Sequence, residues 1–267
     1  VSLCVPAQAL SHIAPIFDRC HYAGCRRTLV EEMLWGGYRM QWEQAQFRLS
    51  TDSMVLADFC ALPRRAAVCD LGCGCGSLSL LLCAKYPDAH LTGVELQPSA
   101  AALAQRNIET NALQDRMEVI CGDLRAHRAL LSHSGFDAVV SNPPYYPIGS
   151  GKQSSEPLLA AARTELTCTL DELCACAAWL LKSGGRFFLV HKPERLADVI
   201  CALRLHRLEP KRIRFVRHRV DAPISLVLLE SRLNANAGLS FEPELVLYRP
   251  DGTESADFRR IYHHQED

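Results

Sequence analysis

Short apolar runs alternate with longer amphipathic or leucine-rich stretches from residue 66 onward. The runs have the length and β-branched content of buried strands, and the stretches between them are long enough for helices. The predicted strands are residues 67–71, 91–95, 117–120, 136–141, 186–190, 211–216 and 224–230. Alternating strands and helices predict a doubly wound, mostly parallel sheet with helices on both faces. We therefore expect a seven-stranded α/β fold with a small N-terminal extension.

The predicted helices fill the stretches between these strands. They are residues 54–59, 77–86, 99–111, 125–132, 170–181 and 194–205. Ser50, Thr51 and Asp52 are N-cap residues for the first helix, and Gly184-Gly185 is expected to stop the fifth. The last two strands form a hairpin. Ahead of the sheet, the aromatic stretch 29–48 around Gly36-Gly37 predicts either a small β-hairpin or a lid over a pocket.

The loop after strand 136–141 carries the clearest chemical signal. It reads Asn142, Pro143, Pro144, Tyr145, and ligands bind at the carboxyl ends of strands in open α/β sheets. The prolines restrict the loop, so that the Asn142 amide oxygen and the Pro143 carbonyl are two fixed acceptors. Tyr145 adds a flat face on which a ring can stack. The structural alternative is a proline turn that ends a strand beside a core tyrosine.

Two acceptors and a ring suit a planar –NH2 group. The lone pair of such a nitrogen is delocalised, which makes it a poor nucleophile. Acceptors for both N–H bonds favour tetrahedral geometry and stabilise the positive charge that develops during attack. No strong general base is needed, because the amine loses its proton after it becomes cationic.

A glycine-rich loop follows the first strand. Gly72, Gly74 and Gly76 lie between a strand and a helix, where glycine lets the backbone approach a ligand. Glu95 ends the next strand, where it can accept hydrogen bonds from ribose hydroxyls, and Asp123 ends the third. An NAD site is the competing interpretation, but Ser77 replaces the last glycine of its fingerprint. Asp70 also favours a ligand with an ammonium and a sulfonium over a pyrophosphate, although loop-capping carboxylates are the structural alternative.

Composition limits the class of protein. The 267 residues are 48% hydrophobic and 22% charged, which is typical of a globular protein that buries a full core. No apolar run could cross a bilayer and no signal segment is visible, although Val1 in place of Met indicates a trimmed start. The 13 cysteines are an odd number and indicate reduced thiols and a cytoplasmic location. Their spacing predicts no metal site.

The stretch 204–219 is strongly basic, although the net charge of the chain is −1. Its candidates for contacts with RNA phosphates are Lys211, Arg212 and Arg214. A solvated surface with no ligand is the equally weighted alternative.

These motifs together resemble a known family. The segment Asp70 to Gly76, with Glu95, Asp123 and the Asn-Pro-Pro-Tyr loop, is similar to class I S-adenosylmethionine-dependent methyltransferases that methylate amino groups. Further segments resemble the bacterial tRNA(Val) adenine-N6 methyltransferases and their uncharacterised relatives: residues 36–38, 50–56, 191–196 and 208–213. The resemblance covers roughly Leu29 to Tyr262 and implies the Rossmann-like class I methyltransferase fold.

The resemblance also implies roles for individual residues. Asp70, Gly72 and Gly74 would line the methionine end of S-adenosylmethionine, and Glu95 would hold its ribose. Asp123 would bind the adenine amino group, with Thr51 or Asp52 closing the pocket near the methionine. Asn142 would lie where the cofactor meets the substrate. Cys73 and Cys75 depart from the usual small residues of the loop, and their side chains are expected to point away from the ligand.

The expected activity is methylation of an exocyclic amino nitrogen, with adenine N6 in tRNA or another structured RNA as the leading substrate. N5-methylation of a protein glutamine, methylation of the guanine 2-amino group, and an RNA-binding protein without turnover are the alternatives. We expect no membrane partner. The expected domains are an N-terminal arm and candidate lid at 1–48, a cofactor-binding catalytic domain at 49–234, and a C-terminal extension at 235–267 packed on the same domain.

Overall fold

The central sheet forms from the predicted apolar runs. The computed structural model describes residues 29–43, 50–143, 145 and 168–262. The seven main strands are β3 (Ala67–Leu71), β4 (His90–Glu95), β5 (Met117–Cys121), β6 (Phe136–Ser141), β7 (Leu181–His191), β8 (Leu208–Arg219) and β9 (Ile224–Leu233). Each overlaps a predicted strand, because apolar residues on both faces suit a sheet that helices cover on both sides.

The strand order brings the loops that carry the candidate site residues to the same end of the sheet. It runs β10-β8-β9-β7-β6-β3-β4-β5, and the strands from β3 to β7 pair in parallel. β9 is antiparallel to both β7 and β8, which gives the predicted hairpin. The predicted fold class is confirmed. The carboxyl ends of β3, β4 and β6 therefore meet at the same edge.

Two short strands extend the sheet beyond the seven that the sequence predicts. β10 (Ser240–Phe241) and β11 (Leu245–Tyr248) both pair in parallel with β8, so that the sheet has nine strands within the described residues. Runs of this length are too short to display an alternation of apolar and polar residues. Their position is set by contact with β8.

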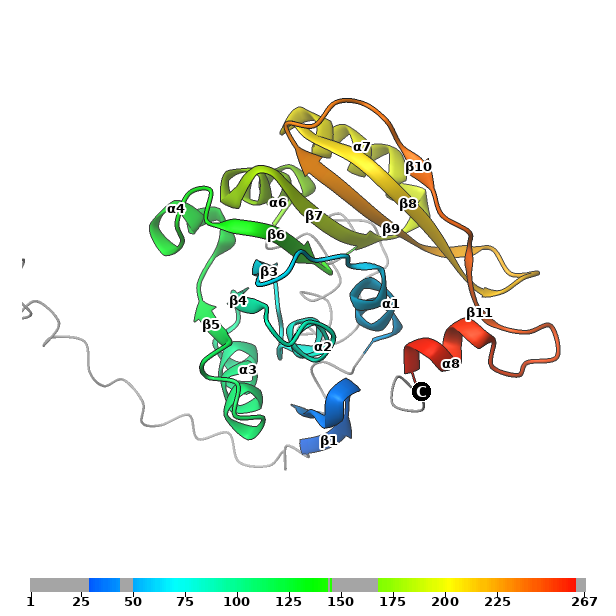
Figure 1. Cartoon of the computed structure of the whole chain (residues 1–267), viewed down its shortest axis with the longest axis horizontal. Coiled ribbons are helices and arrows are strands. Elements are labelled where there is room, and N and C mark those ends of the chain that lie inside the picture. The colour runs from blue at the N-terminus through cyan, green and yellow to red at the C-terminus, as the bar shows by residue number, and fades with distance from the viewer. Residues whose placement is uncertain (1–28, 44–49, 144, 146–167, 263–267) are drawn as a thin grey trace, which may run out of the picture.

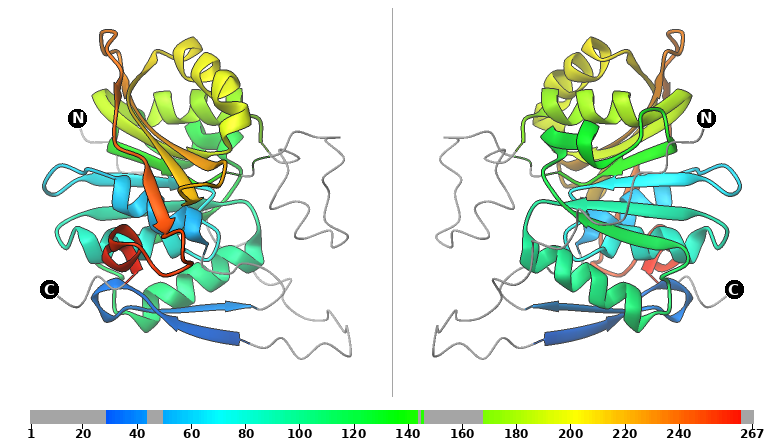
Figure 2. Two further views of the ribbon diagram at one scale, coloured as in Figure 1. Left: turned by 90° about the vertical axis from the view of Figure 1, so that its right-hand side faces the viewer. Right: turned by 90° about the vertical axis from the view of Figure 1, so that its left-hand side faces the viewer.

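Helices cover both faces of the sheet (Figures 1 and 2). α6 (Leu170–Leu180) and α7 (Leu196–Leu205) pack on one face, and α1 (Thr51–Phe59), α2 (Ser77–Lys85), α3 (Pro98–Thr110) and α8 (Ala256–Tyr262) pack on the other. Shorter helical segments are η1 (Trp35–Gly37), η2 (Leu124–Ala126), α4 (His127–Leu130) and η3 (Pro193–Arg195). None of the helices in the described ranges is long and apolar enough to cross a membrane.

Two of the helix starts carry clear capping signals, and one predicted helix end is misplaced. Ser50 caps α1, and Thr169 with Glu172 forms a capping box at the start of α6. The predicted stop of this helix at Gly184-Gly185 is wrong. α6 ends at Leu180, and the two glycines lie inside β7, because the buried Leu181 already pairs with Phe136 of β6.

The segment before α1 is a hairpin of β1 (Leu29–Met33) and β2 (Arg39–Glu43). Two asparagines attach it, Asn107 in α3 and Asn111 at the C-cap of that helix. The Asn107 amide bonds the backbone N and O of Gln41 at 2.8 and 3.0 Å, and the Asn111 amide bonds those of Arg39 at 2.7 Å each. Trp35 Nε1 also donates to the Ile261 carbonyl of α8 at 2.7 Å. The hairpin alternative is therefore confirmed.

Candidate active site

The Asn-Pro-Pro-Tyr loop leaves the carboxyl end of β6 beside the glycine-rich loop. Asp70 of β3 pairs with Val140 of β6, and Ser141 Oγ donates to the Leu71 carbonyl at 2.8 Å. This buried bond ties the two strand ends together just before their loops begin. Asn142, Pro143 and Tyr145 lie in the described residues, and Pro144 lies outside them.

Asn142 is bonded at both ends of its amide. Nδ2 donates to Ser53 Oγ at 3.1 Å and lies 3.5 Å from Ser50 Oγ, both at the start of α1. Oδ1 accepts from the Tyr145 hydroxyl at 2.6 Å. The side chain thus lies in the loop region rather than in the core, with its oxygen end toward Tyr145.

Tyr145 is held by groups from three elements. Its hydroxyl lies 2.5 Å from Asp52 Oδ2 of α1, as well as near Asn142. Its ring meets the His191 ring edge-on at 5.4 Å between centroids, and Lys192 Nζ lies 4.9 Å from the ring centre. Arg195 donates to its carbonyl at 3.4 Å. The end of β7 and the start of α1 therefore surround this aromatic side chain.

The glycine-rich loop borders open space. Gly72 and Gly74 have φ of 74° and 58°, values that favour glycine, and a Cβ on either would meet no atom within 4 Å. Cys73 and Cys75 are buried. The Cys73 sulfur packs so closely against Gly93 that a Cβ added to this glycine would lie 2.7 Å from it. Burial raises the pKa of the Cys75 thiol to about 11. The cysteines thus point into the protein and leave the outer side of the loop for a ligand.

Asp70 is fully enclosed at the end of β3. It is 1% exposed, and its Oδ2 accepts from the Ser79 hydroxyl of α2 at 2.7 Å. Burial raises the pKa of this carboxyl to about 7. The hydrogen bond from Ser79 lowers the pKa, but its effect is smaller than that of burial. A nearby cation would therefore favour the ionised form.

Glu95 joins β4 to the glycine-rich loop. Its Oε2 accepts from Gly74 N at 2.9 Å and its Oε1 from Gln97 N at 2.8 Å. An ionised carboxylate has about four lone-pair sites, so capacity for further donors remains on both oxygens. The side chain is only 7% exposed, at the edge of the open space beside Gly74.

Two further predicted cofactor residues have partners of their own. Asp123 binds Arg125 through its side chain at 2.5–3.0 Å and through the Arg125 backbone N at 2.9 Å. The hydrogen bond from the Arg125 side chain lowers the pKa of Asp123. Thr51 Oγ1 accepts from the Tyr262 hydroxyl of α8 at 3.0 Å.

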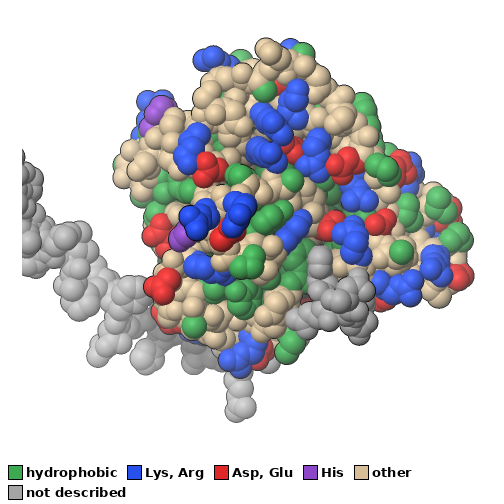
Figure 3. Space-filling model, viewed as in Figure 1, with side chains coloured by type: hydrophobic (Ala, Val, Ile, Leu, Met, Phe, Trp, Pro, Cys, Tyr) green, Lys and Arg blue, Asp and Glu red, His purple; other side chains and the backbone are tan. Residues whose placement is uncertain are grey.

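The basic stretch is engaged within the fold. Arg212 pairs with the buried Glu230 at 2.5 Å and with Glu242 at 2.6 Å. Arg214 lies 3.9 Å from Asp58 and from Asp257, and Lys211 donates to the Asn236 carbonyl at 3.0 Å. Lys and Arg side chains are also interspersed with Asp and Glu on the face seen in Figure 3. This geometry favours the structural alternative over a phosphate-binding face.

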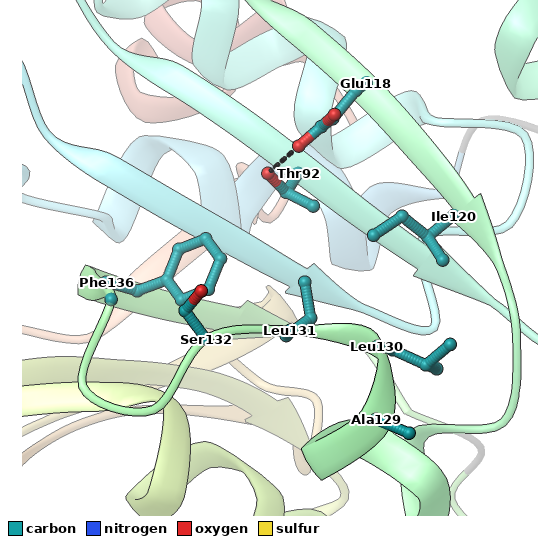
Figure 4. A pocket seen from close by; sticks show the side chains of 9 residues that line it. Thr92, Glu118, Ile120, Ala129, Leu130, Leu131, Ser132 and Phe136 are labelled. Atoms are coloured by element: carbon teal, nitrogen blue, oxygen red, sulfur yellow. Dashed lines mark hydrogen bonds between the residues drawn. The ribbon is translucent and has the colours of Figure 1, made fainter. Parts of the chain in front are cut away.

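A cavity of about 650 Å³ lies elsewhere, between α4 and the edge of the sheet (Figure 4). Ile120, Leu130 and Phe136 line it, and Thr92 donates to Glu118 on its wall at 2.8 Å. It contains no predicted site residue.

The sequence interpretation missed two residues of this region, Ser53 and His191. Ser53 stands between the predicted N-cap residues and the predicted helix, and His191 directly follows a predicted strand, so neither carries a chemical signal of its own. Only the fold brings them to the loop, since Ser53 and Asn142 are 89 residues apart.

Several relatives of this chain are methyltransferases by name. The "methyltransferase small domain" family model matches residues 46–204. A tRNA1(Val) (adenine(37)-N6)-methyltransferase of Porphyromonas gingivalis is 30% identical over 176 residues, which cover 64% of this chain and 68% of that protein. Its namesake in Aliivibrio salmonicida is 28% identical over 217 residues, with 81% and 89% covered. The crystal structure of a predicted O-methyltransferase from Agrobacterium tumefaciens aligns with a TM-score of 0.65 at 22% identity, covering 79% of this chain and 95% of that one.

The family match includes both the glycine-rich loop and Asn142, and it spans more than half of the chain. The predictions of an enzyme, of methyl transfer and of S-adenosylmethionine as methyl donor are confirmed. The chain belongs to the methyltransferase small domain family.

Proposed function

We propose that this enzyme methylates the exocyclic N6 of an adenine in tRNA. The observation that carries the proposal is the Asn142 amide, which stands beside Tyr145 at the end of β6 with its oxygen toward a hydrogen-bond donor. The names of the relatives support adenine in tRNA as the substrate. Methylation of a glutamine amide or of guanine has no comparable support.

Asn142 and Pro143 would bind the target amine through their carbonyl oxygens. Accepting both N–H bonds increases the nucleophilicity of the nitrogen and stabilises it as it becomes positive. The hydroxyl of Tyr145 occupies the Asn142 oxygen in this structure, so the amine would replace it there. The ring of Tyr145 would contact the adenine once the base has left its stack.

Asp70, Gly72, Gly74 and Glu95 are the residues proposed to hold the cofactor. The open space beside the two glycines fits a ligand that approaches the backbone closely. S-adenosylmethionine supplies a methyl group activated by its sulfonium. Asp70 would attract the positive charge of the ligand, and Glu95 would use its remaining lone pairs for ribose hydroxyls. For Asp123 to bind the adenine amino group, its carboxylate would have to share the contact with Arg125.

We infer that the partner is tRNA and that the enzyme works in the cytoplasm, where tRNA would be available. No RNA surface is assigned to Lys211, Arg212 and Arg214, because these side chains have partners in the fold.

The test is transfer of labelled methyl from S-adenosylmethionine to total tRNA, with mass spectrometry of the nucleosides. We expect N6-methyladenosine in a nuclease-sensitive product. Label in protease-sensitive material or in guanosine would contradict the proposal.

Asn142→Ala should reduce turnover by about 10²–10³-fold, the cost of removing one fixed acceptor from a developing charge. The cofactor Kd from calorimetry should stay within about twofold, since binding energy spent only in the transition state leaves the ground state unchanged. The matched control is Asn236→Ala at an exposed position outside this region, which should change neither quantity.

A further inference from the structure

The first turn of α1 lies directly against the Asn-Pro-Pro-Tyr loop. Ser50 caps the helix, and Asp52 and Ser53 follow in its first turn. Ser53 is 4% exposed, and its Oγ faces Asn142 Nδ2 at 3.1 Å. Asp52 Oδ2 faces the Tyr145 hydroxyl at 2.5 Å. These polar contacts between α1 and the loop therefore fall on the two groups proposed to meet the substrate.

The orientation of the Asn142 amide decides whether the site can work. The two ends of an amide have nearly the same shape, but one accepts hydrogen bonds and the other donates them. An amide turned with Nδ2 toward the substrate would face the N–H groups of the substrate amine with N–H groups of its own, and no hydrogen bond could form. Two serine oxygens, at 3.1 and 3.5 Å, converge on the nitrogen end and leave the oxygen end facing Tyr145.

The Tyr145 hydroxyl has more acceptors than it can serve. It carries one hydrogen, yet Asn142 Oδ1 lies 2.6 Å away and Asp52 Oδ2 lies 2.5 Å away. When another donor binds Asn142 Oδ1, the hydroxyl can turn its hydrogen entirely to Asp52. The carboxylate thus offers the tyrosine a partner at the moment the substrate takes the amide oxygen.

We propose that the first turn of α1 positions the catalytic amide: Ser53 fixes the Asn142 oxygen toward the substrate amine, and Asp52 receives the Tyr145 hydroxyl when the amine binds. This inference rests on the proposed amino methylation. Ser53 and Asp52 act through Asn142 and Tyr145, and neither touches the reacting atoms.

The first test compares Ser53→Ala, Ser53→Thr and wild type in steady-state methylation of tRNA. Loss of one neutral hydrogen bond from the amide should lower kcat about five- to tenfold. KM for tRNA and the cofactor Kd should stay within about twofold, because the role is to orient a group used in the transition state. Ser53→Thr keeps the hydroxyl and should restore most of kcat.

The matched control is Ser231→Ala. Ser231 is fully buried in β9, and its Oγ has no hydrogen-bond partner in the described part of the chain, so its removal should leave kcat unchanged. If Ser53→Ala keeps the wild-type kcat, or loses it only together with cofactor affinity and melting temperature, the role of Ser53 is wrong.

The second test is a double-mutant cycle between Asp52 and Tyr145. Asp52→Ala should lower kcat severalfold in the wild type but have no effect in a Tyr145→Phe background, where no hydroxyl needs a partner. Asp115→Ala, at an exposed position, controls for loss of a negative charge. Equal losses in both backgrounds would overturn the role of Asp52.

The experiments distinguish a wrong proposed function from a wrong positioning role for α1. If wild-type protein methylates no nucleoside in tRNA, the proposed function is wrong. If wild type is active and the variants above match it, only the positioning role is wrong.

Discussion

His191 ends β7 with its imidazole fully buried against the ring of Tyr145. Its Nδ1 accepts from Lys192 N at 2.9 Å, so the neutral ring carries its hydrogen on Nε2. Nε2 is buried and has no hydrogen-bond partner among the described residues. Burial, helped by the Arg195 cation, lowers the pKa of His191 to about 4. The site therefore contains an imidazole that stays neutral at physiological pH.

This histidine should make the fold sensitive to acid. Its pKa is lower in the folded than in the unfolded chain, so the unfolded chain binds the proton first as pH falls. The contribution of His191 to stability should be constant above about pH 6.5 and should fall by up to about 3 kcal/mol between pH 6.5 and 4. The Asp70 carboxyl, whose pKa burial raises to about 7, changes stability in the opposite sense over the same range, so the His191 contribution is the difference between wild type and a variant without this histidine. Urea unfolding across this range measures it.

His191→Phe should reduce the loss in that window, because phenylalanine does not titrate. His90→Gln, at an exposed position on β4, should leave the pH profile unchanged. An equal loss of stability in His191→Phe and wild type would show that other groups cause the acid sensitivity.

At the scale of elements, α1 is anchored at the end opposite the candidate active site. Lys85 of α2 reaches the last turn of α1 and donates through Nζ to the carbonyls of Ala57, Asp58 and Cys60 at 2.5–3.0 Å. A cation at a helix C-terminus also interacts favourably with the helix dipole. One end of α1 is thus fixed by a lysine, while the other contacts Asn142 and Tyr145.

Lys85→Met should remove this anchor while keeping the apolar stem of the side chain. Three carbonyls would lose a charged donor in a partly buried place, which we expect to cost about 2–4 kcal/mol of unfolding free energy. Lys182→Met is the control. Lys182 forms an exposed pair with Asp137, so its loss should cost less than about 1 kcal/mol. Denaturant unfolding of the two variants measures both losses of unfolding free energy. Similar losses in Lys85→Met and Lys182→Met would contradict the anchoring role of Lys85.

The sequence predicted the elements whose signals are local. The strand before Asn142 is an apolar run that ends at two prolines, and the glycine-rich loop follows a similar run, so both were found in place. The roles of Arg212 could not be found in this way. Its partners Glu230 and Glu242 lie 18 and 30 residues further along the chain, and only strand pairing brings them together.

Long-range pairing also explains why the basic stretch 204–219 looked unbalanced. Within it the sequence shows one acid, Glu209. Carboxylates from outside the stretch lie beside four of its seven basic residues: Arg212, Arg214, Arg217 and Arg219. Arg204 pairs with Glu209 itself. Local charge counting therefore overstated the positive charge available to RNA.

At the scale of the whole molecule, Asn107 joins three parts of the chain. Its fully buried amide bonds the Gln41 backbone in the hairpin, and its Nδ2 also donates to the Cys75 carbonyl in the glycine-rich loop at 2.9 Å. The hairpin, α3 and the cofactor loop thus share one side chain. This connection links a segment that precedes the family match to the loop proposed to hold the ligand.

Asn107→Ala should detach the hairpin and destabilise the protein. It leaves one buried and two partly buried backbone groups without their partner, for an expected cost of about 3 kcal/mol or more. Asn111→Ala removes the more exposed pair of bonds to Arg39 and should cost about 1 kcal/mol. Hydrogen exchange of the Gln41 amide should accelerate in Asn107→Ala; unchanged protection there would contradict the link.

The two asparagines bind only the main chain of β2, and this determines which amino-acid replacements the hairpin can accept during evolution. The side chains at positions 39 and 41 take no part in the attachment, so they are free to drift among residues that remain extended. Proline is the replacement that the arrangement excludes, because it lacks the N–H that each asparagine oxygen requires. Selection at this contact should therefore fall on position 107 of α3 and on position 111 directly after it, while the residues of β2 that they bind vary.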